Sequence, residues 1–177
     1  MGQALSGLTP LDLTDVYRAA LVQAVAALDA YVHDVVLDRA VEIVMGVRPG
    51  GSNTKVGLHF GAVSDLISAP NTLELQMRSK VLVNERLSME TFQKPDDIAK
   101  AFAMVGIGAI WSSAFGQSGA EPAKIALSVV VRRRNQIAHR CDMDPSAVST
   151  YLALSDADAS DAIDTVERTV TALDSLL

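Results

Sequence analysis

The stretch LVQAVAALDAYVHDVVLDRAVEI, residues 21–43, decides the fold class because its apolar residues recur at spacings of three, four or eight. This period matches one face of an α-helix, so the stretch predicts a core-facing helix. No glycine or proline interrupts the chain between Pro10 and Gly46, and Thr9 before Pro10 is typical of a helix start. We therefore expect one long helix, or two in line, over residues 10–45. The apolar stripe is made of Leu21, Val25, Leu28, Val32, Val35 and Ile43.

The composition favours a single all-α domain over residues 1–177. Hydrophobic residues make up 49% of the 177 positions, enough to bury one substantial core, whereas aromatic residues make up only 5%. The single cysteine, Cys141, excludes an internal disulfide, and we expect it to be a small buried filler. The most apolar run, residues 101–111, is too short to span a bilayer, so we expect a cytoplasmic protein without membrane contact.

Glycine, proline and small polar residues divide the rest of the chain. They predict a loop over residues 45–57, followed by further helices. A helix that starts at KPDD (94–97) carries its apolar residues to about Phe115, and Pro122 lies at or near the first turn of the next. The other two predicted helices span residues 58–69 and 72–88, and a last helix begins among the aspartates at 156–161.

A second line of residues on the first helix changes from small to polar. Alanines permit close approach of a neighbouring helix, and the same line continues through Tyr31 to Asp34 and Asp38. The two aspartates are thereby placed near whatever helix packs there. Because charged helix residues are usually exposed, a solvated edge is the favoured interpretation of Asp34 and Asp38.

The segment RRRNQIAHR, residues 132–140, concentrates cations in a chain of formal net charge −6. Net acidity argues against a general nucleic-acid coat, so any nucleic-acid contact must be local. Arg134 stands where the apolar stripe of its helix would continue, and a half-buried guanidinium needs a carboxylate or phosphate partner. His139 lies roughly 140° further round an ideal helix, but the two side chains can converge if the helix ends near them. Pro145 predicts such an end.

These residues resemble the HEPN ribonucleases, which are small all-helical domains with paired active sites across a dimer. Arg134, Asn135 and His139 match the family's signature of an arginine, a polar residue, three further residues and a histidine. Four segments follow in the order of the RiboL-PSP branch, namely residues 28–40, 89–102, 106–116 and 133–145. The resemblance implies a helical bundle with a long N-terminal helix and a motif-bearing helix near 122–140.

The resemblance further implies a metal-independent RNA endonuclease that leaves 2′,3′-cyclic phosphate and 5′-hydroxyl ends. His139 would transfer a proton and Arg134 would stabilise the charge that develops on phosphorus, roles that suit these side chains. Asn135 would orient the histidine or bind a phosphate oxygen. The other arginines of the segment, Arg132, Arg133 and Arg140, would contact the RNA backbone. A solvated cationic helix end explains each of these three equally well.

The expected partners are RNA, a second copy bound through the motif-bearing face, and an antitoxin or defence-system protein. Tyr31, His33, Asp34 and Asp38 are candidate supporting residues, although a structural helix pair is favoured for His33 and Asp34. No metal-ligand spacing is present, so neither a metal nor another cofactor is expected. The resemblance places the ribonuclease in a toxin–antitoxin or antiphage setting. Two other interpretations compete with the ribonuclease. One is a non-catalytic HEPN module that binds RNA or a partner protein, and the other is a dimerisation domain in which Arg134 pairs with Asp34 or Asp38.

Overall fold

The computed structural model describes residues 13–51, 57–147 and 150–177, and within them the secondary structure is helical. An isolated antiparallel bridge joins Met143 to Tyr151, and no strand occurs in these ranges. The prediction of an all-α fold is therefore confirmed. The helices are α1 (Thr14–Val44), α2 (Phe60–Ile67), α3 (Thr72–Leu87), α4 (Pro95–Met104), α5 (Ile110–Arg140) and α6 (Asp156–Asp174).

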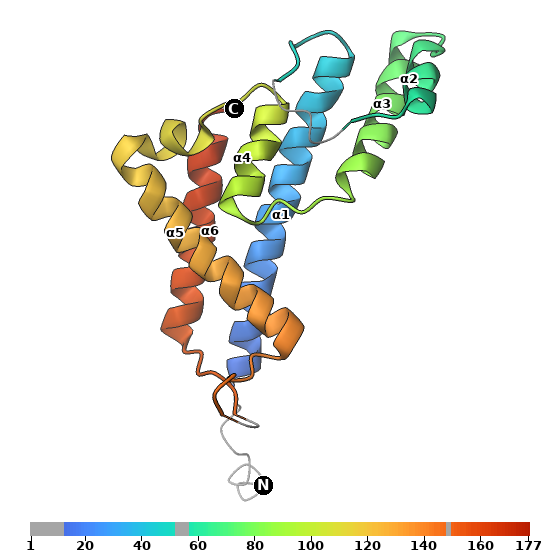
Figure 1. Cartoon of the computed structure of the whole chain (residues 1–177). Coiled ribbons are helices and arrows are strands. Elements are labelled where there is room, and N and C mark those ends of the chain that lie inside the picture. Colours follow the sequence, from blue (N-terminus) through green and yellow to red (C-terminus); the bar gives the residue numbers. More distant parts are fainter. Residues whose placement is uncertain (1–12, 52–56, 148–149) are drawn as a thin grey trace, which may run out of the picture.

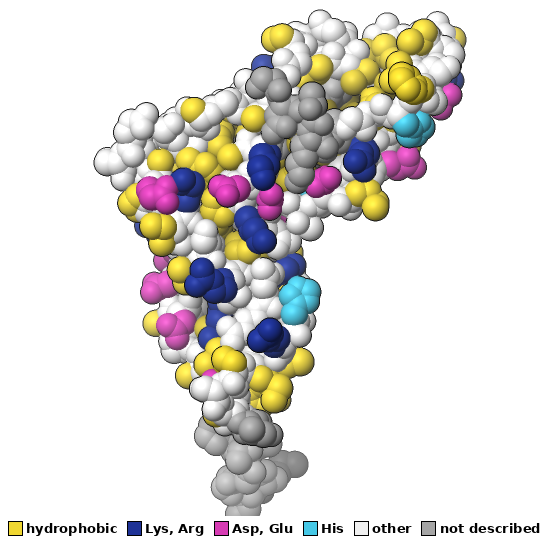
Figure 2. All heavy atoms as spheres, in the orientation of Figure 1, with side chains coloured by type: hydrophobic (Ala, Val, Ile, Leu, Met, Phe, Trp, Pro, Cys, Tyr) yellow, Lys and Arg dark blue, Asp and Glu magenta, His cyan; other side chains and the backbone are white. Residues whose placement is uncertain are grey.

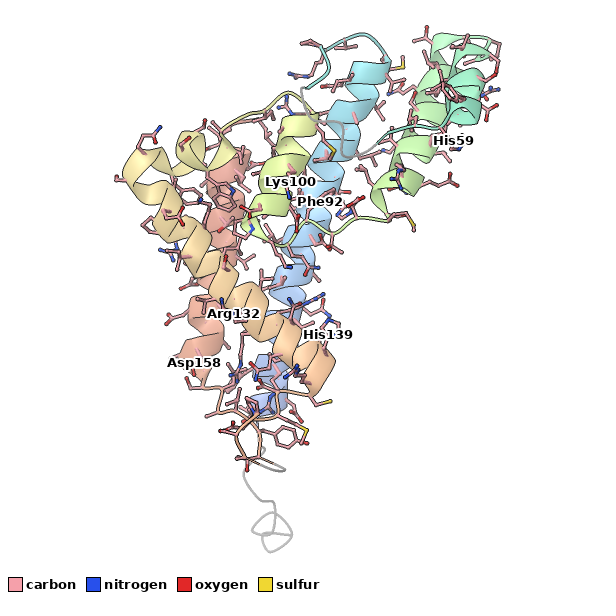
Figure 3. The ribbon with its side chains drawn as sticks, viewed as in Figure 1. His59, Phe92, Lys100, Arg132, His139 and Asp158 are labelled. Atoms are coloured by element: carbon pink, nitrogen blue, oxygen red, sulfur yellow. The ribbon has the colours of Figure 1, made fainter. Side chains whose placement is uncertain are left out.

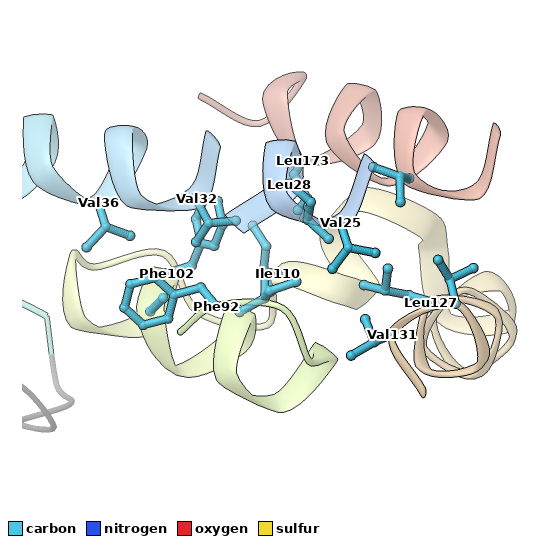
Figure 4. Close-up of a cluster of buried hydrophobic side chains, with 14 of the residues drawn as sticks. Val25, Leu28, Val32, Val36, Phe92, Phe102, Ile110, Leu127, Val131 and Leu173 are labelled. Atoms are coloured by element: carbon cyan, nitrogen blue, oxygen red, sulfur yellow. The ribbon is translucent and has the colours of Figure 1, made fainter. Parts of the chain in front are cut away.

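Helix α1 is the central element of the bundle, as Figure 1 shows, and it contacts α3, α4, α5 and α6. The predicted stripe is buried from Leu21 to Val32, while Val35 and Ile43 are half-buried at the edge of the core. The predicted start at Thr9 and Pro10 lies outside the described residues. Figure 4 shows how side chains of α1, α4, α5 and α6 meet in one core, among them Val25, Leu28, Phe102, Ile110, Leu127 and Leu173.

Helix α1 is also long and apolar enough to cross a bilayer, by length and composition alone. The central helix of a bundle has the same properties, and 33% of the most apolar window of α1 is buried by the rest of the chain. Helix α6 lies along α1 and begins, as predicted, among the aspartates at 156–161. A capping box of Ser155 and Asp158 fixes this start.

The helix expected from 94 to about Phe115 is in fact broken. Helix α4 ends at Met104, and α5 begins at Ile110. Between them, Gly106 (φ +85°) and Ala109 (φ +52°) adopt left-handed backbone conformations, which end a helix. The Trp111 indole N–H then donates to the Pro95 carbonyl (2.9 Å), so α5 starts beside the first turn of α4.

Helix α5 contains a second break at Gly116 (φ +71°, ψ 167°), which confirms the predicted end there. The chain then turns helical again and continues to Arg140. Pro122 is the sixth residue of this second section, so it lies near the first helical turn, as predicted, but not within it. This section starts directly after Gly116, earlier than the helix start that Pro122 indicates. A motif-bearing helix near 122–140 is present as expected.

Helices α2 and α3 form a hairpin that we call the arm (residues 60–87), and their predicted bounds are correct to within two residues. The His59 ring accepts from the Ala62 N–H (3.1 Å), and the Asn71 side chain accepts from the Glu74 N–H (2.8 Å). Both side chains therefore cap helix N-termini. Helix α3 packs on α1, whereas α2 packs on α3 alone among the described helices. The arm consequently projects from the bundle, as Figure 1 shows.

Candidate functional site

The candidate site occupies the last turns of α5. The preceding turns are anchored in the core by Leu127, Val130 and Val131, two of which are labelled in Figure 4. The helix ends after Arg140 because Cys141 (φ +50°) and Asp142 (φ +58°) both adopt left-handed conformations. The predicted helix end beside His139 is thus present. Cys141 is exposed, so its prediction as a buried filler is wrong.

Arg134 is half-buried and has unused hydrogen-bonding capacity. Its Nη1 donates to Asn135 Oδ1 (2.9 Å), while its Nε is buried and has no hydrogen-bond partner. Within the described ranges, Arg134 forms no ion pair with an acidic side chain. The Nε of Arg133 is likewise buried without a partner, so the missing carboxylate is what distinguishes Arg134 and leaves its guanidinium able to bind an anion from outside the fold.

His139 is exposed in the last turn of α5, one residue before the helix end, as Figure 3 shows. Its ring makes no hydrogen bond or ion pair to any residue that the structure describes, so no described side chain fixes its orientation. Arg134 and His139 therefore share a helix end without contacting each other through a hydrogen bond. Arg132 and Arg140 are also exposed, whereas Asn135 is half-buried.

The neighbouring Arg133 has a different environment, because it belongs to a buried ion cluster around Asp142. The Asp142 side chain is 0% exposed, and its Oδ2 accepts from Arg133 Nη2 (2.8 Å) and from Arg18 Nε on α1 (2.9 Å). Both arginines also donate to the Leu152 carbonyl, at 3.2 and 3.3 Å. The hydrogen bond to Asp142 raises the pKa of the Arg18 guanidinium. We call these three side chains the Asp142 cluster.

The Asp142 cluster joins α1, α5 and the chain after α5. Arg133, predicted to contact the RNA backbone, already has an anionic partner inside the fold, and its backbone contact stays a prediction. Sequence reasoning did not identify Arg18 or Asp142. Arg18 stands 124 positions before Asp142, and no local pattern relates the two.

Two of the candidate supporting residues connect helices away from the motif. The Tyr31 hydroxyl donates to Asp174 Oδ1 on α6 (3.2 Å), and burial, followed by the Asp174 charge, raises the pKa of Tyr31. His33 lies between the carbonyls of Asp29 (2.8 Å) and Leu87 (3.2 Å) and packs against Phe92. His33 thus fastens α1 to the end of α3.

The two aspartates of α1, Asp34 and Asp38, are exposed, and neither forms an ion pair with Arg134 or His139. The favoured reading as a solvated edge is consistent with this exposure. Among the described residues no ion pair joins Arg134 to either aspartate, so the structure gives no support to the reading in which Arg134 simply pairs with one of them.

A groove of about 850 Å³ runs from the start of α4 along α5 and reaches the motif at Asn135. Its cations are Lys94, Lys100, Lys124 and Arg132. Acidic side chains offset several of them, since Lys124 pairs with Glu121 (2.5 Å) and Lys100 lies 3.9 Å from Asp97. Figure 2 shows Lys and Arg side chains spread over this face between α4 and the end of α5. Sequence reasoning found only Arg132 and Asn135, because the groove depends on how α4 packs on α5.

The described residues contain no group of three or more His, Cys, Asp or Glu side chains arranged to hold a metal ion. Comparison of the whole chain with family models, curated proteins and solved structures finds no match.

Proposed function

We propose that this protein is a metal-independent RNA endonuclease of the HEPN type, with its site at the end of α5. The observation that carries the proposal is the contrast at Arg134. This guanidinium is half-buried, holds Asn135 and has no carboxylate partner among the described residues, while Asp142 neutralises the adjacent Arg133. An RNA phosphate is an anion with the geometry that a guanidinium binds best.

The chemistry needs a proton carrier and a cation. The 2′-oxygen attacks the adjacent phosphorus as it loses its proton, the bond from phosphorus to the 5′-oxygen breaks, and that oxygen takes up a proton. The products are a 2′,3′-cyclic phosphate and a 5′-hydroxyl. His139 serves as proton carrier, and Arg134 stabilises the charge on the non-bridging phosphate oxygens. Asn135 holds the Arg134 guanidinium through the hydrogen bond described above.

One copy offers a single histidine at this site, whereas the reaction benefits from both a base and an acid. A homodimer through the motif-bearing face supplies two copies of His139 and doubles the local positive charge. The proposal includes a cytoplasmic location and a toxin–antitoxin or antiphage role, with an antitoxin or defence-system protein as the controlling partner. Light scattering at micromolar concentration tests the dimer, and a strictly monomeric protein counts against it.

A non-catalytic HEPN module that binds RNA or a partner protein is the second candidate. One observation favours it, namely that no described residue orients the His139 ring. In that case the groove beside Arg132 serves for binding alone.

Incubation of the purified protein with labelled tRNA and mixed RNA in EDTA separates the two candidates. We expect fragments with 2′,3′-cyclic phosphate ends, and none with the variant His139→Ala. RNA that is bound but stays intact supports the binding module instead.

A further inference from the structure

The arm carries an unusual amount of exposed apolar surface. Phe60 is 95% exposed, Ile67 is 80% exposed and Met77 is 58% exposed, although hydrophobic side chains of this size are normally buried. The other large hydrophobic side chains exposed on the arm are Val63, Leu73 and Val81. Figure 2 shows hydrophobic side chains gathered over the upper part of the arm.

These residues are arranged as helical stripes. Phe60, Val63 and Ile67 follow at spacings of three and four on α2, and an adjoining face of α2 buries Ala62 and Leu66. Leu73, Met77 and Val81 follow at spacings of four on α3, whose buried residues Ser79, Val83 and Leu87 lie on another face. Helix α2 packs on α3 alone and α3 packs on α1 and α2, so no further described helix packs on either outer stripe. Among the described residues, both outer stripes stay exposed and are free to contact another molecule.

The arm also has a groove between its two helices, with a volume of about 400 Å³. Met77, Val81 and Leu82 form its apolar wall, and Asp65, Glu74 and Arg78 form its rim. Arg78 bridges the two helices, because it donates to Glu74 (2.9 Å) and to the Asp65 carbonyl (2.9 Å). The arm thus bears projecting apolar side chains together with a hollow able to receive them, which is what a self-complementary interface requires.

The charge of the arm favours a second copy over a membrane. Residues 60–87 contain three acidic side chains (Asp65, Glu74, Glu85) and three basic ones (Arg78, Lys80, Arg86), so the arm is neutral in a chain of net charge −6. Two arms can meet without the repulsion that opposes contact between the acidic parts of two copies. Helices that lie on anionic membranes need an excess of lysine and arginine on the polar face, and the arm has none.

The size of the surface agrees with a dimer. The six exposed apolar side chains present on the order of 600 Å², the upper end of what the largest patch of a monomer reaches. A standard interface buries about 800 Å² on each partner, and polar neighbours such as Lys80 and Arg78 supply the remainder. Two helical hairpins that meet through apolar stripes form a four-helix bundle, a common dimer architecture.

We infer that the arm is an interface for a second copy of this chain, formed by α2 and α3 against the same helices of the partner. This interface is distinct from the motif-bearing face. Arg18 near the start of α1 contacts the region of the motif, whereas His33, four helical turns further on, contacts the arm at Leu87. The inference does not depend on ribonuclease activity.

Sedimentation velocity of the full chain across micromolar concentrations tests the interface. Ile67→Glu and Met77→Glu, each on an exposed stripe, are expected to weaken association at least about tenfold. Val47→Glu is the matched control, since Val47 is 71% exposed outside the arm, and it is expected to associate like the parent. Circular dichroism confirms that the variants fold. A monomeric parent, or arm variants that associate like the parent, would overturn the inference.

Cross-linking gives a second readout that keeps the two proposed interfaces apart. In a Cys141→Ser background, Ile67→Cys is expected to yield a dimer with a short bis-maleimide, whereas Val47→Cys is not. Cys141 of the parent, exposed directly after the motif helix, reports contact through the motif-bearing face in the same assay. Equal yields from Ile67→Cys and Val47→Cys contradict the arm interface, whatever Cys141 shows. Binding of the arm to anionic phospholipid vesicles in place of self-association contradicts it too.

Discussion

Arg133 and Arg134 are neighbours on α5, yet the fold treats them in opposite ways. Arg133 points to the side where Asp142 and Arg18 complete a buried ion cluster. Arg134, turned about 100° round the helix, holds only Asn135 and has no described carboxylate partner, although the Nε atoms of both arginines are buried without a hydrogen bond. The same residue type at adjacent positions therefore belongs once to the fold and once to the candidate site. A cluster of arginines in a sequence does not reveal this division.

The largest effect is expected when His139, the proposed proton carrier in the same helix end as Arg134, is removed. His139→Ala is expected to lower the single-turnover rate of RNA cleavage by about 10²–10⁴-fold, because proton transfer contributes that much to such reactions. The melting temperature should stay unchanged, since the ring is exposed and contacts no described residue through a hydrogen bond.

His59→Asn serves as the control for the loss of an exposed histidine. Asparagine preserves the cap of α2, so both the fold and the cleavage rate should match the parent. If His139→Ala cleaves RNA as fast as the parent, the nuclease proposal is wrong and the binding module takes its place.

The second prediction concerns the Arg133 side of the comparison. Asp142→Asn leaves Arg133 without a described carboxylate partner and Arg18 with only the exposed Asp15, and breaking a buried ion pair in this way costs about 3–5 kcal/mol. Asparagine tolerates the left-handed backbone at this position, so the charge is the main change.

Urea unfolding monitored by circular dichroism measures the loss. Asp144→Asn, in the same turn, is the control: its carboxylate accepts hydrogen bonds from Ser146 that an asparagine oxygen can keep, so it should unfold much closer to the parent than Asp142→Asn. A parent-like midpoint for Asp142→Asn would mean that the Asp142 cluster contributes little to the fold, and the division between the two arginines would lose its basis.

Short stretches of sequence specify much of the fold, and this explains why the sequence predicts it. The apolar period of residues 21–43 and the aspartates at 156–161 specify α1 and the start of α6 without reference to the rest of the chain. The break before Ile110 was missed because Ala109 adopts a left-handed conformation, which alanine rarely does, and only packing of α5 on α4 through Trp111 selects it.

The candidate site likewise combines residues that the sequence identifies by local spacing with residues that only the fold brings together. Arg134, Asn135 and His139 lie within one helix, so their spacing alone identifies them as candidates. Asp142 became important only because α1 brings Arg18 to it, and that is a contact over 124 positions. The stripes of the arm illustrate the same limit, since a period of three and four predicts an apolar face but does not tell whether this chain or another covers it.

The third prediction tests the unpaired arginine directly. Arg134→Ala is expected to lower the cleavage rate by about 10²–10³-fold, the usual cost of removing one group that stabilises developing charge. Its free energy of unfolding should change little, because no described carboxylate loses a partner. Arg133→Ala, by contrast, deprives Asp142 of one of its two guanidinium partners and should be the less stable variant. Equal destabilisation of the two variants would break the comparison and assign Arg134 to the fold.

The smallest effect is expected at Arg132, which is exposed and lies between the motif and the groove toward α4. As a contact to the RNA backbone it adds affinity without chemistry, so Arg132→Ala should weaken RNA binding less than about tenfold and leave the rate of bound RNA unchanged. Each phosphate contact releases about one counterion, and the slope of log Kd against log salt should therefore fall by about one.

Arg168→Ala on α6 changes the net charge equally at an exposed position outside the groove, and it should leave this slope unaltered. Titrations of both variants at several salt concentrations with a His139→Ala background, which keeps the RNA intact, distinguish a local contact from the general charge of the protein. Identical slopes for the two variants would show that Arg132 is a solvated helix residue, and the RNA path along the α4–α5 groove would have to be abandoned.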